Sequence, residues 1–372
     1  MRILVTGSNG FVGKNLVTRL NELKNYEVLC FDRNCDEDDL AMMASKADWV
    51  FHLAGVNRPE DDNEFLKDNL DLTKLLVESL VSTGNKVPII LTSSIQAKHD
   101  NPYGVSKAAA EQAVLDYMQS NKVVSYIYRL PNVFGKWCKP NYNSVVATFC
   151  HNIVHDLPID INDENASLEL VHIDDVCDDF ISLVSNETMP KGGFREVQNI
   201  HHTTVGEIVK LLNKFKDSRA NLSTEDVGVG FTRAMYSTYL SYLEPDDFKY
   251  EITNHNDARG SFAEMLKTND SGQISFFSAK PGVIRGGHYH HTKTEKFLVI
   301  KGNAKFRFEN ILTKEYKEIL VSGDLPEIVD TSPGWSHDIQ NIGKDEMFVM
   351  LWANECFDQD NPDTIAYEIN NE

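Results

Sequence analysis

The sequence predicts an α/β fold with a doubly wound parallel sheet, followed by an all-β domain. Up to about residue 243, short β-branched or aromatic segments such as RILVTG and YEVLCFD alternate with helical patterns such as KNLVTRLNELK. This alternation is typical of a parallel sheet with helices on both faces. A glycine-rich turn follows the first strand-like segment. From about residue 250, strand-like segments such as KFLVIKGNAKFRFEN follow one another without long helical patterns, which indicates a sandwich or barrel.

The boundary between the two patterns lies near the segment SYLEPDDF. We therefore expect one domain at residues 1–243 and a second at residues 246–372. Each is long enough to bury a core of its own.

The chain is strongly acidic, with a formal net charge of −20 over 372 residues. This charge provides no basic footprint for nucleic acid or for an anionic membrane, so we expect neither as a partner. No apolar stretch approaches the ~20 residues of a membrane span, and the apolar N-terminus lacks the charged start of a signal peptide. The six cysteines form no CxxC pair, which is typical of reduced thiols in a cytoplasmic protein.

The glycine-rich turn has the spacing GxxGxxG and joins the first predicted strand to a helix. Glycine there permits a tight turn and close approach to a pyrophosphate, and the helix N-terminus supplies N–H donors to the phosphates. Asp32 ends the next predicted strand, where a carboxylate can bind an adenosine ribose. The alternative is a strand–helix turn without a ligand. The turn residues that we expect to contact a dinucleotide are Gly7, Asn9, Gly10, Phe11, Val12 and Gly13.

Arg33, directly after Asp32, bears on the choice of cofactor. An arginine here can pair with the 2′-phosphate of NADPH, whereas an aspartate alone favours NADH. We favour NADPH over NADH, and the alternative for Arg33 is a solvated surface charge.

A second motif, LTSSIQAKHDNPYGVSK, contains the groups needed to reduce a ketone. Tyr103 and Lys107 are four residues apart and share one face of a predicted helix. The ammonium group can stabilise the phenolate and lower the pKa of Tyr103, which would protonate the carbonyl oxygen as hydride reaches the carbon. Ser94, at the preceding strand end, can bind the same oxygen. A lone YxxxK pair is often a surface Tyr and Lys, but here it follows both other motifs.

These motifs resemble the extended short-chain dehydrogenase/reductase family, over roughly residues 1–243. The resemblance implies a Rossmann-type fold and a nucleotide-diphosphate sugar as substrate. Leu53 and Ala54 in HLAG match the strand that lines the adenine side, and Asn132 in RLPNVFG matches a residue that contacts the nucleotide sugar.

One departure from the family pattern restricts which reaction is expected of the N-terminal domain. Dehydratases of the family carry an Asp-Glu pair just after the strand that ends in TS, whereas here Ile95 and Gln96 follow Ser94. Ketone reduction is therefore expected in place of dehydration.

The C-terminal domain contains a cluster of histidines. His288, His290 and Glu295 lie between two glycines at a spacing that fits the first cupin motif, and His337 lies in a second half-motif, PGWSHDIQN. Histidine and carboxylate ligands suit Zn²⁺, Fe²⁺, Mn²⁺ or Ni²⁺, and we favour Zn²⁺. His291 is expected to face away, because neighbouring strand residues alternate between faces. The alternative is a metal-free cupin that uses these histidines as core or acid/base groups.

The alternative draws support from a second resemblance. The segments NDARGSFAEMLK and VIRGGHYH are similar to those of metal-free cupins that epimerise dTDP-4-keto-6-deoxyhexoses at C3 and C5. That match implies that Arg285 faces the sugar diphosphate and that His288 is the catalytic base. His288 therefore has two competing assignments, metal ligand and base.

The full chain resembles bifunctional capsular polysaccharide enzymes that act on UDP-2-acetamido-2,6-dideoxy-hexos-4-ulose, a UDP-linked 4-keto-6-deoxy amino sugar, on the route to UDP-N-acetyl-L-fucosamine. The resemblance implies a homodimer in which the cupin epimerises C3 and the N-terminal domain reduces C4 with NADPH. Epimerisation comes first, because the 4-ketone that acidifies the C3 proton is lost on reduction. Three alternatives remain: a reductase with a structural, dimerising cupin, a cofactor-binding sensor, and a 4-epimerase that recycles its cofactor.

Overall fold

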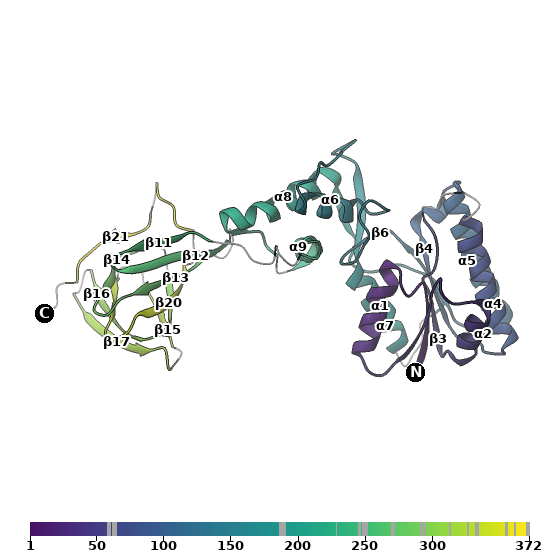
Figure 1. Cartoon of the computed structure of the whole chain (residues 1–372), viewed down its shortest axis with the longest axis horizontal. Coiled ribbons are helices and arrows are strands. Elements are labelled where there is room, and N and C mark those ends of the chain that lie inside the picture. Colours follow the sequence, from purple (N-terminus) through teal and green to yellow (C-terminus); the bar gives the residue numbers. More distant parts are fainter. Residues whose placement is uncertain are drawn as a thin grey trace. The chain divides into compact units, whose positions relative to one another are not determined.

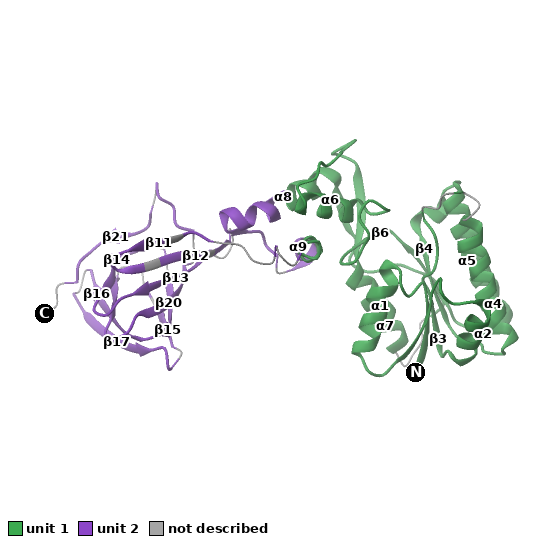
Figure 2. Ribbon diagram, viewed as in Figure 1, with its two compact units in different colours: residues 1–212, 234–243 green, residues 213–233, 244–372 purple. Residues whose placement is uncertain are grey.

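The computed structural model of the chain comprises two compact units (Figures 1 and 2). Contacts group residues 1–212 with 234–243, and residues 213–233 with 244–372. The residues described are 1–372 except 58–60, 62–64, 186–190, 228, 245–246, 248–251, 269–271, 291–292, 294, 312–313, 326, 332–334, 354–355, 361 and 370–372.

The first unit alternates strands and helices, as the sequence predicts. Its elements up to the fifth strand are β1 (Arg2–Thr6), α1 (Phe11–Glu22), β2 (Glu27–Phe31), α2 (Glu37–Lys46), β3 (Trp49–His52), the π-helical η1 (Leu66–Asp71), α4 (Leu72–Ser82), β4 (Ile89–Ser94), the 3₁₀-helical η2 (Ile95–Lys98), α5 (Pro102–Asn121) and β5 (Tyr126–Leu130). The elements that follow are β6 (Asn132–Phe134), α6 (Val145–Val154), β7 (Ser167–His172), α7 (Ile173–Ser185), β8 (Gly193–Arg195), β9 (His201–Thr204), α8 (Val205–Asn221), β10 (Ser223–Thr224) and α9 (Gly230–Leu240).

The main sheet of this unit is entirely parallel, in the order β2-β1-β3-β4-β5-β8. Helices α1 and α7 cover one face and α2, α4 and α5 the other (Figure 1). Because both faces are covered, the central strands are rich in buried apolar residues, and all four residues of β3 are buried. The strand order reverses between β1 and β3, which is where such sheets bind ligands at the carboxyl ends of the strands. The predicted doubly wound sheet is confirmed.

Three short strands form a separate sheet in the order β6-β7-β9. Strand β10 lies in residues 213–233 and therefore belongs to the second unit, where it pairs in parallel with β12. The predicted domain limits of 1–243 and 246–372 stay a prediction.

The second unit is built almost entirely from strands. They are β11 (Asn254–Asp257), β12 (Gly260–Thr268), β13 (Gly272–Ala279), β14 (Ile284–Tyr289), β15 (Glu295–Lys301), β16 (Asn303–Asn310), β17 (Tyr316–Ser322), β18 (Ile328–Asp330), β19 (Trp335–Asn341), β20 (Met347–Ala353) and β21 (Ile365–Ala366).

These strands form two sheets that enclose one apolar core. One sheet has the order β10-β12-β13-β20-β15-β18, with β11 paired to β12, and the other has the order β17-β16-β19-β14-β21. Phe277 and Phe297 of the first sheet and Phe306 and Ile339 of the second belong to the same buried cluster. Alternate residues of strands such as β15, β16 and β20 belong to this core, and the all-β, cupin-like prediction is confirmed.

Within the part of the chain that the structure describes, no helix combines the length and apolar character needed to cross a bilayer.

Candidate functional site

The glycine-rich turn lies where the carboxyl end of β1 meets the start of α1. Gly7 has φ +68°, and a Cβ atom there would lie 2.7 Å from the Cα of Ala54, so the turn is packed directly against the end of β3. Gly10 precedes α1 and provides no side-chain cap. The first backbone N–H groups of α1 are therefore free of a side-chain cap and can donate hydrogen bonds to an anionic ligand. Phe11 and Val12 are half-buried at this helix start.

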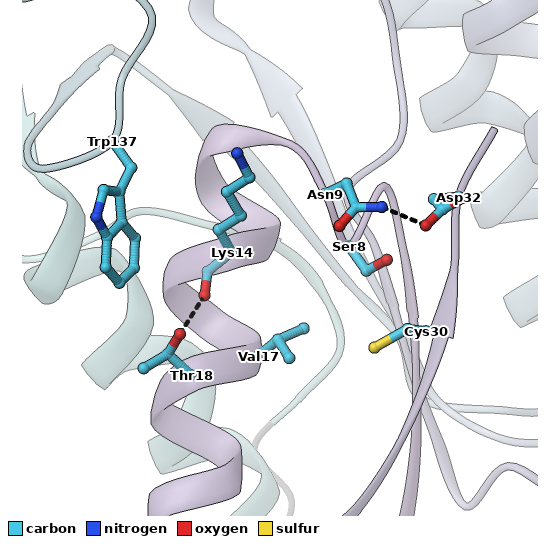
Figure 3. Close-up of a pocket in the computed structure, with 8 residues that line it drawn as sticks. All are labelled: Ser8, Asn9, Lys14, Val17, Thr18, Cys30, Asp32 and Trp137. Atoms are coloured by element: carbon cyan, nitrogen blue, oxygen red, sulfur yellow. Dashed lines mark hydrogen bonds between the residues drawn. The ribbon is translucent and has the colours of Figure 1, made fainter. Parts of the chain in front are cut away.

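A pocket of about 570 Å³ extends from this turn along α1 (Figure 3). Asp32 lies in it, and its carboxylate accepts hydrogen bonds from the Asn9 side chain and from the backbone N–H of Asn34, the latter at 2.8 Å. Arg33 is exposed and does not line this pocket. The lining residues are Ser8, Asn9, Lys14, Val17, Thr18, Cys30, Asp32 and Trp137.

Several of these lining residues were not predicted. Lys14 directly follows the third glycine of the turn, and that position could have suggested it. Trp137 comes from a loop more than a hundred residues away, and nothing in the sequence signals its place.

The HLAG segment, which begins at the last residue of β3, contacts the end of β1 just before the glycine-rich turn. The backbone N–H of Leu53 donates to the Thr6 carbonyl at 3.2 Å, and that of Ala54 donates to the Thr6 hydroxyl at 3.3 Å. His52 is fully buried between the hydroxyls of Thr6 and Thr73, at 2.7 and 2.8 Å, and burial lowers its pKa to about 3. It is thus a neutral, structural histidine.

The first turns of α5 carry Tyr103 and Lys107, and the helix starts at the Asn101 side chain, which accepts from the Gly104 N–H at 2.8 Å. The Tyr103 ring lies 5.6 Å from that of Phe65, centroid to centroid. Burial raises the pKa of Tyr103, and a hydrogen bond with Ser94 offsets this only in part. Ser94 thus lies close enough to Tyr103 to influence its pKa, and the role of both residues in catalysis stays a prediction.

Lys107 is buried, and its ammonium group lies 6.0 Å from the centre of the Tyr103 ring. It donates to the Thr92 carbonyl at 3.2 Å, and burial lowers its pKa to about 8. The pKa of Tyr103 is nevertheless raised overall, because burial of the phenol outweighs the groups that favour its ionised form. A neutral phenol is the form that can donate a proton.

A buried carboxylate that the sequence did not single out lies one turn further along α5. Glu111 accepts from the Ser93 hydroxyl at 2.5 Å and from the Arg129 guanidinium at 2.9 and 2.6 Å. These bonds tie α5 to β4 and β5, so they fix the helix that carries Tyr103 against the strand that ends at Ser94. Glu111 also raises the pKa of Lys107, against the larger effect of burial.

Asn132, predicted to contact substrate, is the first residue of β6 and is exposed. Its side chain makes no hydrogen bond to any residue in the described ranges. It is therefore available to a ligand, but the structure does not connect it to the other predicted residues.

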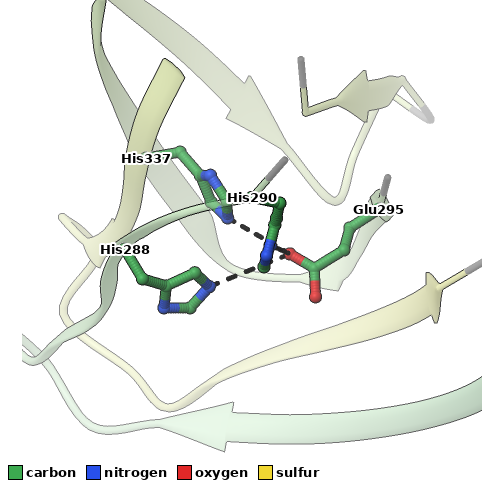
Figure 4. A group of neighbouring side chains, drawn as sticks. All are labelled: His288, His290, Glu295 and His337. Carbon is green, nitrogen blue, oxygen red and sulfur yellow. Dashed lines mark hydrogen bonds and ion pairs between the residues drawn. The ribbon is translucent and has the colours of Figure 1, made fainter. Parts of the chain in front are cut away.

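In the second unit, four predicted metal ligands converge (Figure 4). His288 on β14 and His337 on β19 are register partners in one sheet, His290 follows β14, and Glu295 begins β15 in the other sheet. The ligand atoms of all four lie within 4.8 Å of one another. The sequence prediction that these residues converge is borne out by this geometry. His291 and Gly334, which the motifs also include, lie outside the described residues.

The hydrogen bonds of this cluster test whether a cation fits. His290 Nδ1 lies 2.5 Å from the Asp363 carbonyl, which can only accept, so the proton of a neutral His290 is on Nδ1. Its Nε2 then presents a lone pair to Glu295 Oε2 at 3.1 Å, acceptor against acceptor. A cation between the two atoms, or a second proton on His290, removes this conflict. Three imidazoles and one carboxylate are a donor set that suits a divalent metal.

The electrostatics of the cluster agree with this donor set. Burial alone would raise the pKa of Glu295, but the nearby imidazoles of His288, His290 and His337 and the charge of Lys293 hold it well below its usual range. Burial lowers the pKa of His337, so its imidazole is neutral. A carboxylate and neutral imidazoles are the protonation states that bind metal.

The cluster opens into a pocket of about 250 Å³. Arg285 lines this pocket together with His288, and its guanidinium lies 4.9 Å from the centre of the Phe277 ring. Arg259, which the sequence did not assign, lines the same pocket. The lining residues are Arg259, Phe262, Phe277, Arg285, Gly286, His288, Glu295, Phe297, Phe306, His337, Asp338, Ile339 and Leu351.

Comparison with known proteins assigns both parts of the chain. Residues 3–197 match the NAD dependent epimerase/dehydratase family, and residues 255–365 match the polysaccharide biosynthesis C-terminal domain. The family match supports a nicotinamide cofactor.

Two relatives cover almost the full chain. The UDP-2-acetamido-2,6-beta-L-arabino-hexul-4-ose reductase of Pseudomonas aeruginosa is 53% identical over 369 residues, which span 99% of both proteins. The crystal structure of the capsular polysaccharide assembling protein CapF from Staphylococcus aureus is 44% identical, with a TM-score of 0.92 over 99% of this chain and 100% of that one. A UDP-glucuronic acid 4-epimerase of Bacillus cereus in complex with NAD, 18% identical with a TM-score of 0.56 over 65% of this chain and 98% of its own, shares the fold. The resemblance found in the sequence is thus confirmed, and the chain belongs to the NAD-dependent epimerase/dehydratase family.

Proposed function

We propose that the first unit reduces the C4 ketone of a UDP-linked 2-acetamido-2,6-dideoxy-hexos-4-ulose with NADPH. In this proposal the second unit first epimerises the same sugar at C3, and the product serves capsular polysaccharide synthesis as a precursor of UDP-N-acetyl-L-fucosamine. The observation that carries the proposal is the placement of Ser94 at the end of β4 near Tyr103, with Lys107 on the same face of α5. The 53% identity to a reductase named for such a sugar supports the substrate class.

The residues of the first site have separate tasks in the reduction. Bound NADPH supplies the hydride to C4. Tyr103, kept neutral by burial, donates a proton to the oxygen that becomes the hydroxyl, and Ser94 orients that oxygen. The positive charge of Lys107 stabilises the phenolate that remains, and its contact with the Thr92 carbonyl holds it in place.

The proposal of NADPH rests on Arg33, which directly follows Asp32 at the end of β2. Arg33 is exposed beside it and can pair with a 2′-phosphate.

In the second unit, we assign His288, His290, Glu295 and His337 to a divalent metal, with Zn²⁺ first among the candidates. The metal would supply Lewis-acid stabilisation of an enolate oxygen. Arg285 lines the same pocket and is assigned to the sugar diphosphate. The side chain of His288 is 25% exposed, against 1% for His290 and 3% for His337. His288 is thus the ligand that substrate can reach, and its second assignment as base stays open.

The burial of the cluster favours one alternative, in which the metal only stabilises the second unit and does no chemistry. An epimerase and a structural cupin predict different C3 labelling of the keto sugar when NADPH is left out. If the second unit is an epimerase, the full chain exchanges the C3 proton of the keto sugar for deuterium in D₂O. A structural cupin leaves C3 unlabelled.

We propose a homodimer as well. The proposal rests on the resemblance of the full chain, and several large apolar side chains that are exposed in the second unit are available to an interface. They include Ile284, Ile300, Leu320, Leu325, Ile328, Ile342 and Phe357.

The test of the proposed reductase is NADPH oxidation in the presence of the 4-keto nucleotide sugar. We expect NADPH to be consumed only when the keto sugar is added. If no 4-keto nucleotide sugar leads to oxidation, the proposal fails and a cofactor-binding sensor takes its place. Tight retention of oxidised NAD without net turnover would favour the 4-epimerase that recycles its cofactor.

A further inference from the structure

Lys293 lies between His290 and Glu295 in the sequence and is only 9% exposed. Its ammonium group lies 3.3 Å from Glu295 Oε1. A buried ammonium is costly unless a carboxylate or comparable acceptor pairs with it, so this contact has to be part of the folded arrangement.

The two oxygens of Glu295 consequently face different partners. Oε2 faces His290 and His337, each at 3.1 Å, whereas Oε1 faces Lys293. With Oε1 held by the ammonium group, only Oε2 is directed at the point where the imidazole nitrogens converge.

Lys293 is itself held by the C-terminal segment. Its backbone N–H donates to Asp363 Oδ2 at 2.8 Å, and the carbonyl of the same Asp363 accepts from His290 Nδ1 at 2.5 Å. Strand β21 just beyond pairs with β14, which carries His288. One segment thus fixes both the ring of His290 and the backbone of Lys293.

We propose that Lys293 is a positioning residue that restricts Glu295 to a single oxygen ligand for the metal. The inference rests on the metal centre of the proposed function and adds a residue that belongs to neither cupin half-motif. Groups that bond to metal ligands in this way typically contribute about 10–100-fold to metal affinity.

A purely structural role for Lys293 is the competing explanation. In that case the lysine only neutralises a buried carboxylate, and its loss lowers the thermal stability without changing how metal is bound.

The test compares Lys293→Met with Lys296→Met, which removes the same charge from an exposed position next to Glu295. Metal dissociation constants of the full chain are measured by competition with a chelating dye. We expect Lys293→Met to bind Zn²⁺ about 10–100-fold more weakly than wild type, Lys296→Met to bind as wild type, and Lys293→Arg to recover most of the loss. In the zinc-loaded Lys293→Met protein, X-ray structures should show both Glu295 oxygens near the metal.

Asp363→Ala provides a second variant in case Lys293→Met does not fold. It keeps the lysine but removes the carboxylate that holds its backbone, so we expect weaker metal binding in the same direction. Equal metal affinity in Lys293→Met and Lys296→Met would overturn the role of Lys293 while leaving the metal centre in place. Failure of the wild-type chain to bind any divalent metal would overturn the metal centre itself.

Discussion

Replacement of Tyr103 by phenylalanine removes the phenol that the mechanism needs and little else. The ring packs against Phe65 at 5.6 Å, and phenylalanine retains that contact. Because burial raises the pKa of Tyr103, the wild-type residue is protonated at neutral pH and its full contribution as an acid is lost in the variant. A positioned general acid contributes about 10²–10⁴-fold to the rate. This corresponds to about 2.7–5.4 kcal/mol of transition-state stabilisation, at about 1.36 kcal/mol per factor of ten.

The assay is NADPH oxidation by the full chain, at saturating keto sugar. We expect kcat to fall by the stated factor while the dissociation constant for NADPH stays unchanged. Tyr117→Phe is the matched control, because it removes another buried hydroxyl of α5, one that bonds to the Val87 carbonyl. A kcat for Tyr103→Phe within about tenfold of wild type would refute the assignment of Tyr103 as the acid.

Three further predictions concern the pH dependence, the metal and the cofactor. Since burial lowers the pKa of Lys107 to about 8, kcat/KM should fall as the pH rises through about 8 and Lys107 loses its proton. Glu111→Gln removes a charge that raises this pKa and should therefore move the fall to lower pH. A pH profile that does not move would contradict the electrostatic coupling of Glu111 to Lys107. A chelator should abolish C3 deuterium exchange but spare NADPH oxidation with an already epimerised ketone. Loss of both would contradict separate sites, and loss of neither would contradict a metal-dependent exchange. Arg33→Ala should raise KM for NADPH about tenfold, which corresponds to about 1.4 kcal/mol of binding free energy, and leave KM for NADH unchanged. Equal effects on both cofactors would contradict the assignment of Arg33 to the 2′-phosphate.

The sequence was informative where function depends on short, regular spacing. The cluster of His288, His290 and Glu295 was predictable because strand geometry converts a fixed spacing into convergence at a turn between paired strands. The pairing of Tyr103 with Lys107 was predictable for the same reason on a helix.

The remaining features depend on contacts between distant segments. Asp363 reaches His290 and Lys293 from about seventy residues away, and no periodic pattern precedes it. Arg129 meets Glu111 only because β5 lies under α5 in the folded sheet. The direction of the pKa shift of a phenol likewise depends on how deeply it is buried, which spacing does not reveal.

The central claim is that one chain uses two sites on one keto sugar in a fixed order. It is tested most directly by the isotope pattern of the product made by the wild-type chain in D₂O with unlabelled NADPH. We predict a reduced sugar with deuterium at C3, taken from solvent, and protium at C4, taken from the cofactor. A reduced product with protium at C3 would contradict the account, because reduction would then have taken place without epimerisation.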